Sequence, residues 1–78
     1  MSDQIRAILT NHARLPIDVA TLANDSDLYD AGLTSLTTVN LMLALEDHFN
    51  VEFSEKMLGR KTFQTIGTLS QAIQELKA

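Results

Sequence analysis

A serine at the start of an apolar helical pattern is the residue of this sequence best placed to do chemistry. Ser35 lies within the stretch DAGLTSLTTVNLMLALE, which runs over residues 30–46. A serine in such a place most often caps the helix by accepting a hydrogen bond from a backbone N–H. Thr34 offers the same hydroxyl one residue earlier, and if Thr34 is the cap, the Ser35 hydroxyl is free in the first turn. The unpaired amides and dipole of a helix N-terminus would then favour a phosphate ester on Ser35.

Enzymatic chemistry at Ser35 finds little support in the rest of the sequence. A nucleophilic serine needs a base within hydrogen-bond reach, whereas His48 would lie roughly 20 Å further along the same helix. His12 cannot be placed from the sequence, and the G-x-S-x-G nucleophile elbow is absent. The chain has only these two histidines, at no ligand spacing, and no cysteine. We therefore predict no catalytic residue, no metal site and no enzymatic activity.

The length and charge of the chain narrow the kinds of protein that it can be. With 78 residues, the chain is expected to form a single domain over 1–78. Ten acidic residues face six basic ones, for a net charge of −4, which disfavours nucleic-acid binding. The local basic group Lys56, Arg60 and Lys61 is typical of a solvated loop. Because no apolar run is long enough to cross a bilayer and no leader peptide is evident, we expect a soluble, cytoplasmic protein with no membrane partner.

The first half of the chain predicts one helix followed by a long connection. The helix should begin at Ser2 as its cap and end before Pro16, with one apolar stripe that recurs at helical spacing: Ile5, Ile8 and Leu9. Residues 15–34 read as a loop with a short helical turn near residues 19–22. Regularly placed apolar residues, including Leu28, Tyr29 and Leu33, should hold this loop on the core and position Ser35.

The second predicted helix, residues 35–49, is apolar on two sides. One arc contains Leu41, Met42, Leu45 and Phe49, and the other contains Leu36, Val39 and Leu43. Either both arcs are buried because the helix lies centrally, or the second is exposed beside Ser35 and forms a docking surface. The spacing alone leaves both interpretations open.

The C-terminal third predicts a short helical turn and a last helix. Ser54 can cap a turn over residues 55–58 that Gly59 ends, and the last helix should run from Thr65 or Gly67 to Leu76. Amphipathic helices of this length must bury their stripes on each other. We therefore predict an all-α fold: a small bundle of three main helices plus one short helix, with a long loop between helices one and two.

The segment DLYDAGLTSLTTVNLMLALEDHFNVEF resembles the central segment of acyl carrier proteins and peptidyl carrier proteins. The residues that match the pattern of this family are Gly32, Leu33, Ser35, Leu36, Val39, Leu45, Glu46 and Phe49. The resemblance covers nearly the whole chain. It implies that Ser35 carries 4′-phosphopantetheine, attached by a phosphopantetheinyl transferase, with Thr34 and Leu36 as its immediate frame.

The sequence also departs from the family in ways that bear on partners. Thr34 stands where the family usually has aspartate, and Thr37 and Asn40 occupy positions that are often acidic. Docking of partner enzymes through positive patches should therefore be weaker. Four residues of the second helix are expected to contact partners: Leu36, Val39, Asn40 and Leu43. The blocks GLTSL, LMLALEDHF and MLGRKTFQTI are similar to small bacterial aminoacyl carrier proteins, which stand-alone relatives of aminoacyl-tRNA synthetases charge with an amino acid.

The resemblance implies a monomeric carrier that does no chemistry itself. It would hold an acyl or aminoacyl group as a thioester on the arm at Ser35. Its partners would be the phosphopantetheinyl transferase, an acyl- or aminoacyl-loading ligase and a downstream transferase. The alternative is an unmodified helical interaction domain derived from a carrier protein, which the threonine before Ser35 favours.

Overall fold

The computed structural model describes residues 1–13 and 15–77, and this part of the chain is helical without a β-strand. The elements follow in this order: α1 Ser2–Ile8, the π-helical segment η1 Leu9–Ala13, the 3₁₀ turn η2 Val19–Thr21, α2 Ser35–Phe49, the 3₁₀ turn η3 Glu55–Met57, α3 Arg60–Phe63 and α4 Ile66–Lys77. The predicted all-α fold is confirmed, as is the long loop before α2. The predicted bounds of α2 agree with those of the structure.

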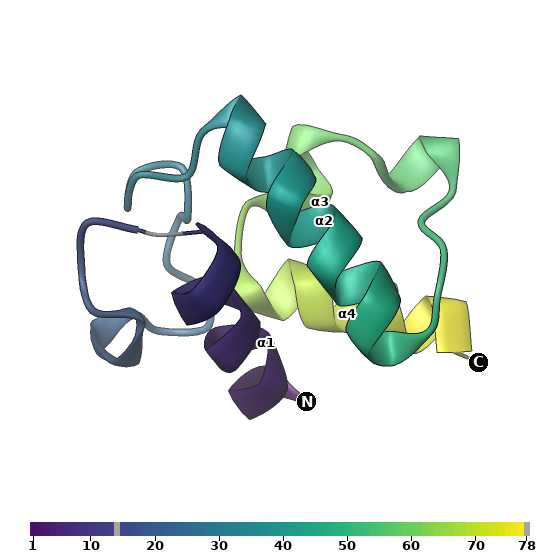
Figure 1. Ribbon diagram of the computed structural model, residues 1–78, viewed down its shortest axis with the longest axis horizontal. Helices are drawn as coiled ribbons and strands as arrows, with labels where there is room; N and C mark the ends of the chain where they lie inside the picture. Colours follow the sequence, from purple (N-terminus) through teal and green to yellow (C-terminus); the bar gives the residue numbers. More distant parts are fainter. Residues whose placement is uncertain (14, 78) are drawn as a thin grey trace.

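The helix α2 is the central element that the others support. Figure 1 shows it running diagonally across the view in front of α4, with α1 beside it and the long loop at the far left. It packs against η1 and α1, while α4 packs against both α1 and α3. This arrangement leaves the N-terminus of α2 at the edge of the molecule, where the long loop delivers the chain to Ser35.

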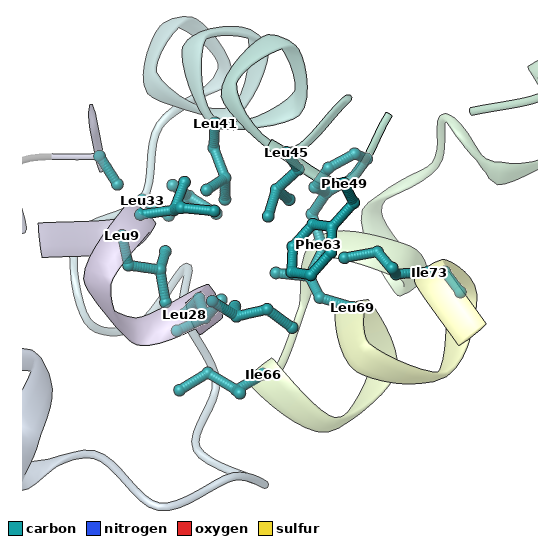
Figure 2. Close-up of a cluster of buried hydrophobic side chains, with 14 of the residues drawn as sticks. Leu9, Leu28, Leu33, Leu41, Leu45, Phe49, Phe63, Ile66, Leu69 and Ile73 are labelled. Carbon is teal, nitrogen blue, oxygen red and sulfur yellow. The ribbon is translucent and has the colours of Figure 1, made fainter. Parts of the chain in front are cut away.

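The core lies between α1, α2 and α4 and is closed by side chains from the long loop and from α3. Figure 2 shows apolar side chains from all of these elements pointing toward one another. Leu41 and Leu45 of α2 are fully buried, as are Leu28 of the loop and Leu69 of α4. Each such side chain contributes roughly 1.5–3 kcal/mol when it is removed from water. Leu28 and Leu33 therefore hold the loop on the core, as predicted, whereas Ile17 of the same loop is exposed.

The first helix differs from the prediction at its start, whereas the helical segment ends before Pro16 as predicted. Ser2 is not the cap: Met1 occupies the N-cap position, no side chain caps the helix, and Ser2 is its first residue. The helical hydrogen bonds begin at Met1, whose carbonyl oxygen accepts from the Ile5 N–H at 3.1 Å. Beyond α1 the chain widens into the π-helix η1, in which Leu9 and Ala13 are both buried. The widened turn keeps residues four apart on the side that faces α2.

Hydrogen bonds between distant residues hold the long loop in place. The Arg6 guanidinium of α1 donates to the Asn24 side-chain oxygen at 2.9 Å. The backbone oxygen of Asn24 in turn accepts from the Gly67 N–H of α4 at 2.9 Å, and the Leu28 N–H donates to the Gln64 carbonyl at 2.7 Å. The loop is thus tied to the first helix and to the junction of α3 and α4.

The basic stretch around Arg60 is a helical turn and not the solvated loop that its charge indicated. Arg60–Phe63 forms α3, with Gly59 at its N-cap. Phe63 is buried and its ring lies 5.5 Å from that of Phe53, centroid to centroid. Burial of this aromatic pair fixes the turn even though its basic residues remain in solvent.

The last helix starts between the two residues predicted for its beginning. It spans Ile66–Lys77, and Thr65 precedes it. The Thr65 hydroxyl accepts from the Thr68 N–H at 2.9 Å, while the Thr68 hydroxyl accepts from the Thr65 N–H at 3.1 Å. This reciprocal pair satisfies amides that the first turn of a helix leaves unpaired.

Candidate functional site

Of the two candidate caps, Thr34 and Ser35, the structure shows that Thr34 caps α2. Its hydroxyl accepts from the Thr37 N–H at 3.2 Å, and the Thr37 hydroxyl accepts from the Thr34 N–H at 2.8 Å. The two threonines form a capping box in which each side chain satisfies the other's backbone amide. From the sequence, Thr37 was notable only as a position that is often acidic in the family. In the structure it is a part of the site, because it completes the capping box.

Because Thr34 provides the cap, Ser35 has no capping role. Ser35 is the first residue of α2 and is exposed to solvent. Within the described part of the chain, its hydroxyl takes part in no hydrogen bond. The other hydroxyls of the first turn are engaged, since that of Thr38 donates to the Thr34 carbonyl at 2.7 Å. Four hydroxyl side chains lie close together here, those of Thr34, Ser35, Thr37 and Thr38. In the described part of the chain, only that of Ser35 is free of hydrogen bonds.

The surroundings of Ser35 fit a phosphate ester. The first amides of a helix have no acceptor within the helix, and the capping box engages the amide of Thr37 but not those of Ser35 and Leu36 in the described residues. These N–H groups and the positive end of the helix dipole lie at the serine. Leu36, which was predicted to frame the site together with Thr34, is 74% exposed, and Ser35 itself is exposed.

We expect Thr34→Ala to lower the free energy of unfolding by about 1 kcal/mol, because the Thr37 amide loses its acceptor. Thr34→Asp should stay within about 0.5 kcal/mol of the original protein, since aspartate caps as well as threonine does. Urea denaturation followed by circular dichroism measures both. Equal stability of the alanine and aspartate variants would show that the capping box does not support α2.

A sharp turn brings the loop to the start of α2. Gly32 has φ of 120°, a conformation that other residues rarely adopt. Its N–H donates to the Tyr29 carbonyl at 3.1 Å, and the Leu33 N–H donates to the Leu28 carbonyl at 2.9 Å. Leu28 and Leu33 are buried. The turn is therefore anchored on both sides, which fixes where the chain enters the helix.

The second apolar arc of α2 is exposed. Leu36, Val39 and Leu43 are 74%, 49% and 54% accessible, whereas Leu41 and Leu45 of the first arc are fully buried. Asn40, the polar residue among them, is exposed as well. The structure decides between the two interpretations that the sequence left open. An apolar strip of three residues, Leu36, Val39 and Leu43, starts next to Ser35 and faces solvent.

An open groove, of which Ser35 is a lining residue, lies between α2 and the segment that contains η3 and α3. Its volume is about 440 Å³. Apolar side chains dominate its wall, and Arg60 lies beside it with the guanidinium carbon 4.2 Å above the centroid of the Tyr29 ring. The lining residues are Tyr29, Ser35, Thr38, Val39, Met42, Leu58, Gly59, Arg60 and Phe63. Neither this groove nor the contact between Arg60 and Tyr29 was predicted from the sequence.

Asp27 holds the wall of this groove together. Its carboxylate accepts from the Gln64 side-chain amide at 3.1 Å and from the Tyr29 N–H at 2.8 Å. The hydrogen bond from Gln64, and then those from the backbone amides of Asp30 and Tyr29 and the charge of Arg60, lower the pKa of Asp27 below its ordinary value of 3.8, although partial desolvation opposes them. The carboxylate therefore links the long loop to the residue that follows α3.

We expect the contribution of Asp27 to stability to disappear in acid. The pKa of Asp27 is lower in the folded chain than in the unfolded one, so its contribution is complete above about pH 4 and is lost as the pH falls through the folded value. The difference in unfolding free energy between the original protein and Asp27→Asn should be constant near neutrality and should shrink below about pH 4. Urea denaturation at a series of pH values measures it. A difference that stays constant throughout would contradict the role of the ionised carboxylate.

Metal ligands and membrane-spanning helices are two further features on which the sequence makes a prediction. Among residues 1–13 and 15–77, no group of three or more histidine, cysteine or acidic side chains could hold a metal ion. His12 lies in η1 and His48 in the last turn of α2. The searched part of the chain also contains no helix long and apolar enough to cross a membrane.

Several known proteins are similar to this chain in sequence and in structure. The family model described as a phosphopantetheine attachment site matches residues 3–73. An aminoacyl carrier protein of Agrobacterium fabrum is 40% identical over 74 residues, which are 95% of this chain and 89% of that protein. A D-alanyl carrier protein of Streptococcus pyogenes is 41% identical over 54 residues, or 68% of each chain.

Two solved structures agree with these relatives. One is an engineered Bradyrhizobium japonicum glycine:[carrier protein] ligase complexed with a carrier protein from Agrobacterium tumefaciens and AMP. A chain of it superposes with a TM-score of 0.92 at 40% identity, covering 95% of this chain and 99% of that one. The other is a holo acyl carrier protein from Nitrosomonas europaea, with a TM-score of 0.83 at 28% identity, covering 95% and 92%.

Proposed function

Since the chain belongs to the phosphopantetheine-attachment family of carrier proteins, we propose that Ser35 is the residue that bears its covalent 4′-phosphopantetheine. The observation that carries this proposal is the free, exposed hydroxyl of Ser35 at the first position of a helix that Thr34 caps. Thr34 and Leu36 frame it. The single domain over residues 1–78 would serve as a carrier and a substrate of separate enzymes, without catalytic activity of its own.

Attachment requires an external enzyme because the serine has no base of its own. His48 lies at the opposite end of α2 from Ser35. A phosphopantetheinyl transferase would supply the base that takes the hydroxyl proton. The Ser35 oxygen would form a bond to the phosphorus that bears the pantetheine, the pyrophosphate bond of coenzyme A would break, and adenosine 3′,5′-bisphosphate would leave. The amides at the start of α2 would face the charge of the resulting phosphodiester.

The proposed cargo is an amino acid held as a thioester. Relatives that match this chain are named aminoacyl and D-alanyl carrier proteins, and the structure with a TM-score of 0.92 contains a glycine:[carrier protein] ligase. We therefore expect a loading ligase of this kind as a partner and a transferase that accepts the aminoacyl group afterwards. The same proposal includes a cytoplasmic location. The ligase structure contains AMP, and an adenylate is ordinarily made from ATP, so loading would take place where ATP is available.

The experiment that tests the function is a loading assay followed by intact mass. The apo protein is incubated with coenzyme A and a broad-specificity transferase, and then with ATP, an amino acid and the glycine:[carrier protein] ligase. We expect a gain of one phosphopantetheine and then of one aminoacyl group. A folded protein that never gains mass would instead support an unmodified interaction domain. The structure weakens that alternative, because Thr34 performs the capping role that aspartate would have.

The apolar strip on α2, together with Asn40, is the proposed docking surface for these enzymes. Contiguous exposed apolar groups beside a reactive group are typical of a protein interface. We expect Leu43→Asp to weaken binding to the loading ligase by about tenfold or more, because a central apolar contact is replaced by a charge that must be desolvated. Surface plasmon resonance with the holo protein measures the affinity.

Gln71→Asp provides the control for the docking experiment, since it also replaces a neutral side chain by one negative charge, on the exposed face of α4. It should leave the affinity within about twofold of the original. Equal losses for the two variants would mean that net charge, and not the apolar strip, governs binding.

A further inference from the structure

Arg60 is a cation beside the groove whose hydrogen-bond donors have no acceptor in the described part of the chain. Its guanidinium rests on the face of the Tyr29 ring at 4.2 Å from the centroid. That contact leaves its five N–H groups available. Asp27 feels the charge of Arg60, but its oxygens accept from Gln64 and from backbone amides. The structure thus holds a charged donor in place without giving it an acceptor.

The position of the aromatic ring under Arg60 is itself fixed. The Tyr29 N–H donates to Asp27, which also binds Gln64, the residue directly after α3. The Leu28 N–H donates to the Gln64 carbonyl at 2.7 Å. The loop that bears Tyr29 and the turn that bears Arg60 are therefore joined through Gln64, which donates one hydrogen bond to Asp27 and accepts another from Leu28. This linkage holds the ring and the guanidinium against one another beside Ser35.

The groove that Ser35 and Arg60 both line matches the chemistry of the arm expected on Ser35. Val39, Met42 and Phe63 give it an apolar wall. The pantetheine chain carries a pair of methyl groups that such a wall accommodates, and phosphate and amide oxygens that need donors. In the described residues lining the groove, the side chain with unused N–H donors is that of Arg60.

We propose that Arg60, held on Tyr29, is a clasp that retains the 4′-phosphopantetheine arm in this groove between encounters with enzymes. The methyl groups of the arm contact Val39 and Met42, and the guanidinium donates to an oxygen of the arm. The inference rests on the proposed attachment at Ser35. It assigns Arg60 and Tyr29 a role in retaining the arm, which the sequence did not predict.

The clasp also explains how docking would release the arm. Val39 lines the groove and belongs to the apolar strip on α2. An enzyme that covers the strip would therefore contact the residue on which the resting arm packs. Because Leu58 and Arg60 at the rim are exposed, the arm can leave the groove without unfolding of the core.

The test compares apo and holo proteins whose methionine and valine methyl groups are labelled with ¹³C. On conversion to the holo form, the methyl signals of Met42 and Val39 should shift and show nuclear Overhauser contacts to the methyl groups of the arm. In Arg60→Gln these contacts should fall about two- to fivefold, as the loss of one exposed charged hydrogen bond implies. Tyr29→Leu should act in the same direction, whereas Tyr29→Phe keeps the ring and should resemble the original.

Lys61→Gln is the matched control, because it removes the neighbouring charge of α3 outside the groove. Equal contacts in Arg60→Gln and Lys61→Gln, or shifts confined to the residues that flank Ser35, would overturn the clasp. Intact mass separates these outcomes from failure of the proposed function. A holo protein without contacts between the arm and the groove contradicts only the clasp, whereas a protein that never gains the arm contradicts both proposals.

Discussion

Ser35→Ala is expected to abolish phosphopantetheine attachment completely while leaving the fold intact. The hydroxyl makes no hydrogen bond in the described part of the chain, and alanine is the better helix former. The free energy of unfolding should therefore stay within about 0.5 kcal/mol of the original. Intact mass after incubation with coenzyme A and transferase measures attachment, and urea denaturation measures stability. No residual activity is expected, because the bond that forms includes the serine oxygen itself.

The neighbouring hydroxyls provide stringent controls for this prediction. Thr34 and Thr37 bind one another, and Thr38 donates to the Thr34 carbonyl at 2.7 Å. Thr38→Ala and Thr37→Ala should therefore remain substrates of the transferase. An adduct of the phosphopantetheine mass on Ser35→Ala would place the attachment on another residue. The assignment of Ser35 would then be wrong even though the chain belongs to the family.

Gly32→Ala is expected to destabilise the protein by about 2–4 kcal/mol, which is a large part of the stability of a domain of this size. At φ of 120° a β-carbon is strained in itself. It would also lie 2.5 Å from Cδ of Pro16, an atom of a rigid ring that cannot swing aside. The turn that delivers Ser35 to α2 would have to open, so attachment should slow together with the loss of structure. Urea denaturation measures the first effect and the initial rate of mass gain the second.

Gly59→Ala separates this effect from the general consequence of replacing a glycine. Gly59 has φ of −117°, and a β-carbon there would meet no atom within 4 Å. We expect a change below about 1 kcal/mol, which reflects only the weaker N-cap preference of alanine. Similar losses for the two glycines would indicate that the left-handed turn at Gly32 is not what holds the loop.

Local features of the chain were predictable because their causes lie within a few residues. The bounds of α2 follow from the threonine before Ser35 and from the apolar period after it, and both were confirmed. The short turn near residue 20 follows from Asp18, whose carboxylate accepts from the Ala20 N–H at 3.0 Å. The sequence offered Thr34 and Ser35 as alternative caps, and the structure shows that Thr34 is the cap and leaves the Ser35 hydroxyl free. The role of Ser35 as the attachment residue stays a prediction.

The failed predictions mark the limits of such local reasoning. A capping serine at residue 2 was a sound expectation from residue type. In the structure Met1 is the N-cap and Ser2 is the first residue of the helix. The basic residues 60–61 indicated a solvated loop, whereas the contact of Phe63 with Phe53 makes this segment helical. That contact joins two phenylalanines ten residues apart across a turn, and the charge of the neighbouring basic residues does not reveal it.

The sequence by itself determined the helical class of the protein and the start of α2, because the apolar spacing and the cap candidates at residues 34 and 35 are local features. That Thr34 is the cap and leaves the Ser35 hydroxyl unused was decided by the structure. Only the tertiary structure decided which apolar arc of α2 faces solvent, because burial depends on where α1 and α4 lie. It likewise decided that Asp27 meets Gln64, 37 residues away, and that Arg60 meets Tyr29. Those contacts exist because folding brings the long loop and α3 to the same side of α2, a consequence of burying the whole core at once.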